Sequence, residues 1–201
     1  GARLIYVLAL LASVGMGFLV LVFSAPYRLQ RLTAYQDPWS DPFGAGFQLV
    51  QSLIAFGRGE WFGVGLGNSI QKLFYLPEAH TDFVFSIWAE ETGLFGALLL
   101  ILLFVGLITR IMQTGWRAAA EGNGFAAYLC FGVGLMFAGQ VFINMGASSG
   151  LLPTKGLTLP FVSYGGSSLI MNCALLGIVL RIAPQLRPEQ RTDQPMSRRV
   201  A

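Results

Sequence analysis

Four apolar stretches constrain this chain more than any other feature, because each is about as long as a helix that crosses a lipid bilayer. They lie at about residues 4–23, 83–108, 125–145 and 168–182. A hydrocarbon core roughly 30 Å thick needs about 20 apolar residues in a helix, and the fourth stretch is slightly shorter than that. Only 11% of the residues are charged, against about a quarter in soluble domains. The sequence therefore predicts an all-α integral membrane protein that forms a single membrane domain.

The basic residues predict which side of the membrane each segment faces, since cytoplasmic loops are enriched in Lys and Arg. Arginines precede the first stretch, occupy the short connection 109–124 and recur in the polar tail 183–201. Those three places are expected in the cytoplasm. A long loop, 24–82, and a shorter segment, 146–167, are then expected outside. The net charge of +3 comes from the tail and the inner connection, so it indicates a membrane surface and not nucleic acid as the partner.

The long outer loop is expected to contain ordered elements. Residues 44–56 carry apolar side chains at helical spacing opposite glutamines, which predicts a short amphipathic helix at the outer interface. The segment GVGLGNS at 63–69 matches no nucleotide-binding fingerprint in full. Its glycines are expected to let the loop fold back into the membrane. A loop of this length with ordered elements is more often functional than idle.

The segment YLPEAHTDF at 75–83 leads into the second apolar stretch and gathers Glu78, His80 and Asp82 at the expected outer boundary of the membrane. A carboxylate that borders hydrocarbon can serve as a proton acceptor, because burial disfavours its charged form. Two other interpretations stay open at this point. Thr81 or Asp82 would also serve as the N-cap of the following helix. The alternating side chains would also suit a divalent metal, although Mg²⁺ or Mn²⁺ that arrives with a diphosphate substrate is favoured over a resident metal.

Glu90 and Glu91 are expected two helical turns deeper in the same continuous helix as Asp82. Acids inside a span are costly and usually face a cavity or a partner. At about 100° per residue, the three acids cannot all line one helix face. Glu90 and Glu91 are therefore interpreted as structural or cavity-lining groups with no chemical role.

A second polar segment, 150–168, precedes the last apolar stretch. It places Lys155 on the outer side and then offers a run of small and polar residues: Ser163, Tyr164, Gly165, Gly166, Ser167 and Ser168. Glycines let backbone amides approach a ligand, and helix N-termini favour anions. A lipid diphosphate headgroup would sit at this depth. The alternative interpretation is a helix cap combined with tight packing.

Several motifs, in order along residues 27–182, resemble the SEDS family (shape, elongation, division, sporulation). They are DPWSDP at 37–42, GFQ at 46–48 followed by QS at 51–52, GRGE at 57–60, GLGNS at 65–69, Lys72, YLPEAHTDF at 75–83 and LPTKGLTLPFVSYGGSS at 152–168. The DPW start, GRGE and GNS resemble the division branch of the family, of the Gram-negative type. The resemblance covers most of the chain.

The family has ten membrane helices, so the resemblance implies that this chain holds the last four. It implies a peptidoglycan glycosyltransferase that polymerises lipid II during cell division, by an inverting displacement that releases undecaprenyl diphosphate. It also implies a class B penicillin-binding transpeptidase and other division proteins as partners. The implied location is the bacterial inner membrane at the septum, with the active site on the periplasmic side. No tightly bound cofactor is implied, and Mg²⁺ or Mn²⁺ would come with the lipid diphosphate.

The resemblance also suggests roles for particular residues. Asp82 matches the family's essential acid and is the candidate general base. A diphosphate leaving group needs positive charge or oriented donors. The candidates for binding the diphosphate or the sugar are Lys155, Lys72, Arg58, Glu78, His80, Ser163, Tyr164, Gly165, Gly166, Ser167 and Ser168.

Two other functions stay open at this stage. A lipid II flippase would need a polar lining that continues through the membrane, for which the chain offers Glu90, Glu91, Gln140 and Asn144. A non-catalytic division scaffold would not need an acid at Asp82 beside a helix end suited to anions.

Overall fold

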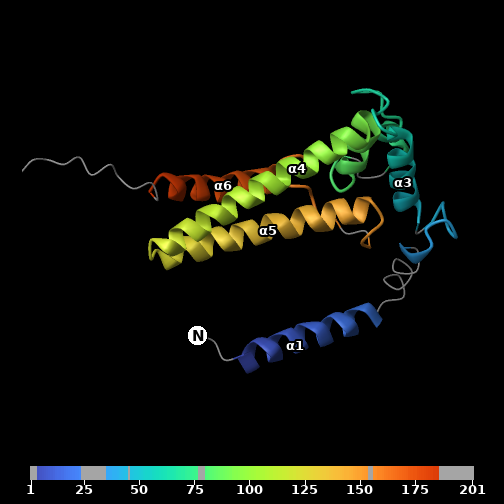
Figure 1. Cartoon of the computed structure of the whole chain (residues 1–201). Helices are drawn as coiled ribbons and strands as arrows, with labels where there is room; N and C mark the ends of the chain where they lie inside the picture. Colours follow the sequence, from blue (N-terminus) through green and yellow to red (C-terminus); the bar gives the residue numbers. More distant parts are fainter. Residues whose placement is uncertain (1–3, 24–34, 45, 77–79, 154–155, 186–201) are drawn as a thin grey trace, which may run out of the picture.

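The computed structural model describes residues 4–23, 35–44, 46–76, 80–153 and 156–185, and the elements within them are all helical (Figure 1). They are α1 Leu4–Phe23, α3 Phe47–Gly59, the short π-helical turn η1 Gln71–Tyr75, α4 Val84–Ala120, α5 Gly124–Ser148 and α6 Gly166–Gln185. The expectations for Glu78, for Lys155 and for the tail beyond residue 185 lie outside the described residues.

The membrane class predicted from the sequence is confirmed. Among the described residues, three helices are long and apolar enough to cross a membrane, namely α4, α5 and α6. α1 has the bounds of the first predicted stretch. α3 corresponds to the predicted amphipathic helix, slightly shifted along the chain.

The connection between α4 and α5 is shorter than the sequence predicts. α4 continues through most of the predicted loop 109–124 and ends at Ala120. The chain then turns at Gly122, which has φ 80, and the Asn123 side chain caps α5 through a hydrogen bond of 3.2 Å. The predicted loop began where the apolar stretch ends, but Arg, Met, Gln and Ala are all good helix formers. The helix therefore continues past its apolar part with charged side chains on its surface.

α4 and α5 form an antiparallel pair with small residues between them (Figure 1). A Cβ atom at Gly115 would lie 2.7 Å from the ring of Phe131, and one at Gly134 would lie 2.7 Å from the sulfur of Met112. Small residues let helix backbones approach closely in a membrane, where van der Waals packing drives association. One buried cluster also brings α6 onto the pair; it contains Ile111, Cys130, Val133, Phe137 and Val179.

α4 is not one continuous rod, because its backbone breaks at Gly93. This residue has φ 68 and ψ −167, a conformation that is essentially restricted to glycine. Beyond the break the chain reverses. The indole N–H of Trp88 donates to the carbonyl of Gly96 at 2.9 Å, although eight residues cover about 12 Å along a straight helix. The first arm of α4 (84–92) therefore folds back toward the second arm (94–120), and we call the two arms the α4 hairpin.

The α4 hairpin corrects the predicted continuous helix. Side chains from both arms share one buried cluster, which includes Phe85, Ala89, Ala97 and Leu100. The sequence placed Glu90 and Glu91 deeper in the membrane than Asp82. In the structure the two glutamates lie near the turn of the α4 hairpin, and Asp82 lies at the open end of its first arm. Hydropathy along the sequence does not record this reversal of direction.

Residues 60–65 of the outer loop complete the hydrogen bonds that the break leaves open. In an unbroken helix the N–H groups of residues 94 and 95 would bind the carbonyls of residues 90 and 91. The loop replaces both bonds: Val64 N donates to Glu90 O (3.0 Å), Gly65 N to Glu91 O (3.1 Å), Leu94 N to Glu60 O (2.9 Å) and Phe95 N to Trp61 O (3.3 Å). The close approach requires glycine, since a Cβ at Gly93 would lie 2.4 Å from Gly63 N.

α3 lies across one end of the α4–α5 pair (Figure 1). The hydroxyl of Ser52 donates to the carbonyl of Ser148 at 2.6 Å, within buried surroundings. The ring of Phe56 packs edge-on against Phe85, with centroids 5.5 Å apart. α1 lies apart from this group in Figure 1, and large apolar side chains along it are exposed.

The segment that joins α5 to α6 descends into the bundle instead of remaining at its end. Leu159 and Pro160 are almost completely buried. Phe161 packs against Phe137 of α5 with ring centroids 5.5 Å apart, about three turns before α5 ends. α6 therefore begins part-way along α4 and α5, as Figure 1 shows.

Candidate active site

Asp82 lies at the open end of the α4 hairpin and is half-buried. The N-cap residue of α4 is Phe83, so neither Thr81 nor Asp82 occupies the capping position that the sequence left open to them. A Cβ atom built on Gly156 would lie 3.4 Å from Asp82 Oδ2. The carboxylate of Asp82 therefore faces the segment that precedes α6.

Three successive carbonyl oxygens around Asp82 each accept a hydrogen bond from a different donor. Tyr164 N donates to His80 O at 2.8 Å, and Ser163 Oγ donates to Thr81 O at 2.5 Å. Asn144 Nδ2 donates to Asp82 O at 2.9 Å. The bonds from Tyr164 and Ser163 join the two polar motifs that the sequence singled out, and Ser163 and Thr81 are 82 residues apart in the sequence.

The hydroxyl of Ser163 is fixed from both sides. Besides donating to Thr81, it accepts a hydrogen bond from Leu159 N at 2.8 Å. Its neighbour Tyr164 is 80% exposed, so that aromatic side chain is accessible beside the site. The backbone of His80 is held in the same place, and the His80 side chain is exposed.

α6 begins at Gly166, two residues before its predicted start at Ser168. The hydroxyl of Ser168 lies 3.1 Å from that of Thr158 and accepts a hydrogen bond from Asn172 Nδ2 at 3.3 Å. The positive end of α6 therefore opens within a few residues of the Ser163–Thr81 contact. Such an end favours a bound anion.

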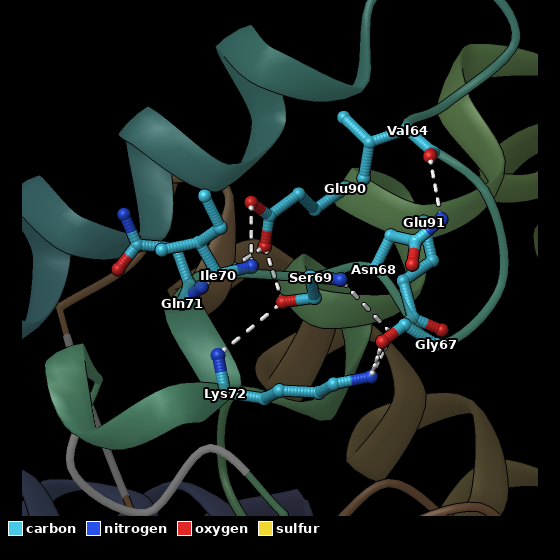
Figure 2. Close-up of polar contacts among 9 residues, drawn as sticks. All are labelled: Val64, Gly67, Asn68, Ser69, Ile70, Gln71, Lys72, Glu90 and Glu91. Carbon is cyan, nitrogen blue, oxygen red and sulfur yellow. Dashed lines mark hydrogen bonds and ion pairs between the residues drawn. The ribbon is translucent and has the colours of Figure 1, made fainter.

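A second polar cluster surrounds the carboxylate of Glu90 near the turn of the α4 hairpin (Figure 2). Glu90 is completely buried. Its carboxylate accepts a hydrogen bond from Ser69 Oγ and two longer ones, both 3.4 Å, from the backbone N–H groups of Ile70 and Gln71. Arg58 Nη1 lies 3.5 Å from the same carboxylate. The interpretation of Glu90 as a structural group fits this arrangement.

The neighbouring acid, Glu91, binds a second cation. Lys72 Nζ donates to Glu91 Oε1 at 2.7 Å and to Gly67 O at 2.6 Å (Figure 2). The sequence offered both Arg58 and Lys72 as candidates for binding the diphosphate or the sugar of the substrate. In the structure each forms an ion pair with a glutamate near the hairpin turn, whereas Asp82 lies at the other end of the first arm.

The alternative that Glu78, His80 and Asp82 hold a metal is not tested, because Glu78 lies outside the described residues. No three His, Cys, Asp or Glu side chains come together as a potential metal site in the part of the chain that the structure describes. Glu78 lies outside that part, as does Lys155.

The sequence reasoning did not assign two of the residues that build this site. Gly156 faces the Asp82 carboxylate. In the sequence it was recognisable only as one residue of the long motif at 152–168. Asn144 is 1% exposed and binds the backbone of Asp82. Its signal was a polar side chain inside an apolar span, a position that is costly and often functional.

The helices define a helical integral membrane protein. Its polar site lies where the first arm of α4 meets the segment that precedes α6. A family model described as Cell cycle protein, for FtsW, RodA and SpoVE, matches residues 1–188. The chain belongs to this family.

Curated relatives support the same assignment. The chain is 53% identical over 198 residues to a protein of Halomonas elongata and 58% identical over 183 residues to one of Coxiella burnetii. Both are named "Probable peptidoglycan glycosyltransferase FtsW". The matches cover 98% and 91% of this chain, but 49% of each relative. The chain therefore spans about half the length of the curated relatives it matches.

A solved structure has a similar fold. It was reported under "Structural coordination of polymerization and crosslinking by a peptidoglycan synthase complex". The similarity has a TM-score of 0.62 at 33% sequence identity, and it covers 92% of this chain and 50% of that chain.

Proposed function

We propose that this chain supplies the catalytic carboxylate, a general base, of a peptidoglycan glycosyltransferase that polymerises lipid II into glycan strands during cell division. The observation that carries the proposal is the environment of Asp82. The backbone carbonyls of His80, Thr81 and Asp82 accept hydrogen bonds from Tyr164, Ser163 and Asn144. The carboxylate of Asp82 faces Gly156. The names of the relatives support the reaction class.

In the proposed reaction Asp82 acts as general base toward the 4-hydroxyl of the acceptor sugar. A bond forms between that oxygen and the anomeric carbon of the donor, while the bond from that carbon to the lipid diphosphate breaks. The hydroxyl proton goes to the Asp82 carboxylate, and the electron pair of the broken bond leaves with undecaprenyl diphosphate. A positioned base lowers such a barrier because it removes the proton as the new bond forms.

The leaving diphosphate needs stabilisation as its negative charge grows. We assign this role to Lys155 and to the residues at the start of α6, including Gly165, Gly166, Ser167 and Ser168. The segment is next to Asp82 through Gly156 and Ser163. Arg58 and Lys72 are weaker candidates, because their charged groups are paired with Glu90 and Glu91. Mg²⁺ or Mn²⁺ would arrive with the lipid diphosphate.

The proposed partner is a class B penicillin-binding transpeptidase, together with other division proteins, at the septum and with the site on the periplasmic side. The support is the solved structure, which belongs to a peptidoglycan synthase complex. A lipid II flippase would have to use polar groups along the membrane helices. Two of the groups available for that, Glu90 and Glu91, are bound to the outer loop.

The test compares glycan-strand formation from purified lipid II by the full-length protein with its transpeptidase partner. Asp82→Asn keeps the size of the side chain and removes the base. We expect its rate to fall by about two to four orders of magnitude, the usual effect of a positioned base. Asp37→Asn removes an exposed acid from the same outer loop and should retain the wild-type rate.

Wild-type strand formation by Asp82→Asn would contradict the catalytic role of Asp82. A wild-type protein that forms no strands but translocates lipid II would contradict the polymerase and favour the flippase. Binding of lipid II by Asp82→Asn should persist, because the substitution removes no binding group on the diphosphate side.

A further inference from the structure

Asn144 connects the two segments that build the site. It lies on α5, one turn before the helix ends, and is 1% exposed. Its Nδ2 group donates to Asp82 O at 2.9 Å and to Leu157 O at 2.6 Å. One neutral amide thus binds the residue proposed as the base and the segment that faces it.

The orientation of the Asn144 amide follows from its partners. Two carbonyl oxygens face the same atom, so that atom must be the nitrogen, which carries two protons. The other end of the side chain, Oδ1, is buried and has no hydrogen-bond partner among the described residues. A buried acceptor without a partner has an energetic cost.

Asn144 also differs from the other donors around Asp82. Ser163 and Tyr164 belong to the irregular segment before α6, and they bind the carbonyls of Thr81 and His80. Asn144 belongs to a long helix whose face is packed against α4. It therefore ties the Asp82 backbone to a helix of the α4–α5 pair.

We propose that Asn144 is a positioning residue that sets the distance between the Asp82 carboxylate and the 156–163 segment. The inference rests on the proposed function of Asp82. Leu at this position would be close in size but would donate to neither carbonyl. Displacement of a reacting group by about 1 Å can reduce the rate about 100-fold. The substitution should act on the chemical step and not on substrate binding, because Asn144 is buried beneath the site.

The first test uses the full-length protein with its partner and lipid II. For Asn144→Leu we expect kcat, per folded protein, to fall about 10- to 100-fold while KM stays within about 3-fold. The matched control is Gln140→Leu. Gln140 lies one turn earlier on α5 and also has a buried carboxamide oxygen without a partner in the described residues, but it is not the donor of the two hydrogen bonds to Asp82 and Leu157, which come from Asn144. The control should keep wild-type kcat and KM.

A second variant separates positioning from a general packing defect. Asn144→Asp has nearly the same shape. When ionised it can donate to neither carbonyl, and when protonated it can donate to one. The ratio of its kcat to that of the wild type should therefore rise as the pH is lowered. Division by the wild-type kcat at each pH removes the pH dependence that the two proteins share. A packing defect would give a ratio that does not change with pH.

Hydrogen exchange tests the connection independently of activity. In Asn144→Leu, backbone amides in 80–86 and 157–163 should exchange faster than in the wild type, and in Gln140→Leu they should not. If the wild type makes no strands, the proposed function fails while this measurement still decides whether Asn144 holds the two segments. Unchanged exchange in Asn144→Leu would overturn the inference. So would an equal loss of kcat in Gln140→Leu, or a rise in KM with kcat unchanged.

Discussion

The carboxylate of Glu90 shows how a buried charge is stabilised in this protein. It is completely buried, and the groups that contact it are donors: Ser69 Oγ, two backbone N–H groups and Arg58. A buried carboxylate without such partners would be very unfavourable. Three of these four donors come from the short segment 69–71. Glu90 therefore holds the outer loop against the turn of the α4 hairpin.

Replacement of Glu90 should destabilise the fold strongly. In Glu90→Leu the donors of the 69–71 segment and Arg58 would lose their acceptor. Breaking a buried, charged network in this way costs about 3–5 kcal/mol, although solvent around the half-exposed Arg58 reduces its share. The free energy of unfolding, measured by denaturation in micelles, should fall by an amount of this size. Glu121→Leu, which removes an exposed acid, should change it by about 0.5 kcal/mol or less. Equal effects of the two variants would show that the cluster contributes little.

At the scale of one element, α4 depends on residues outside itself. Its ladder of backbone hydrogen bonds is interrupted at Gly93 and completed by Glu60, Trp61, Val64 and Gly65. Unpaired backbone groups are costly at membrane depth and must be satisfied by neighbouring protein. The outer loop therefore does more than cover the helices. It forms part of the hydrogen bonding of α4.

Gly93→Ala should disrupt this junction. The φ and ψ of Gly93 are strained for any residue with a Cβ, at about 1–3 kcal/mol, and the new Cβ would lie 2.4 Å from Gly63 N. We expect a loss of at least about 3 kcal/mol in the free energy of unfolding. Gly106→Ala is the matched control, since Gly106 is on the second arm with no neighbour within 4 Å. Alanine favours helix there, so stability should stay or rise. A Gly93→Ala protein as stable as Gly106→Ala would rule out the strained junction.

For the whole molecule, the sequence predicted the helices better than their directions. α1, α5 and α6 lie close to the apolar stretches that predicted them, because hydropathy measures apolar length well. The reversal at Gly93 was missed, since a single glycine in an apolar run is equally compatible with an unbroken helix. The polar motifs around Asp82 and Ser163 were identified beforehand, but their contact and the role of Asn144 depend on packing between segments distant in sequence.

The predicted orientation of the bundle can be tested with single cysteines, in a background that lacks Cys130 and Cys173. Asn68 and Glu121 are both exposed and lie in the outer loop and the α4–α5 turn. Asn68→Cys should react with a membrane-impermeant thiol reagent added to intact cells, and Glu121→Cys should react only after permeabilisation. Labelling of Glu121→Cys in intact cells would invert the orientation and move Asp82 away from the periplasm.

The junction between residues 60–65 and α4 also determines an order of assembly. Residues 60–65 are synthesised before α4, so they must stay available until residues 90–95 have left the ribosome. Only then can the four backbone bonds that join them form. The second arm of α4 can enter the bilayer through its own hydrogen bonds, whereas its first arm cannot be fixed in place until the loop has returned to it. Insertion of the second arm into the membrane therefore does not require this junction, which can form afterwards when the outer loop docks on the turn of the α4 hairpin.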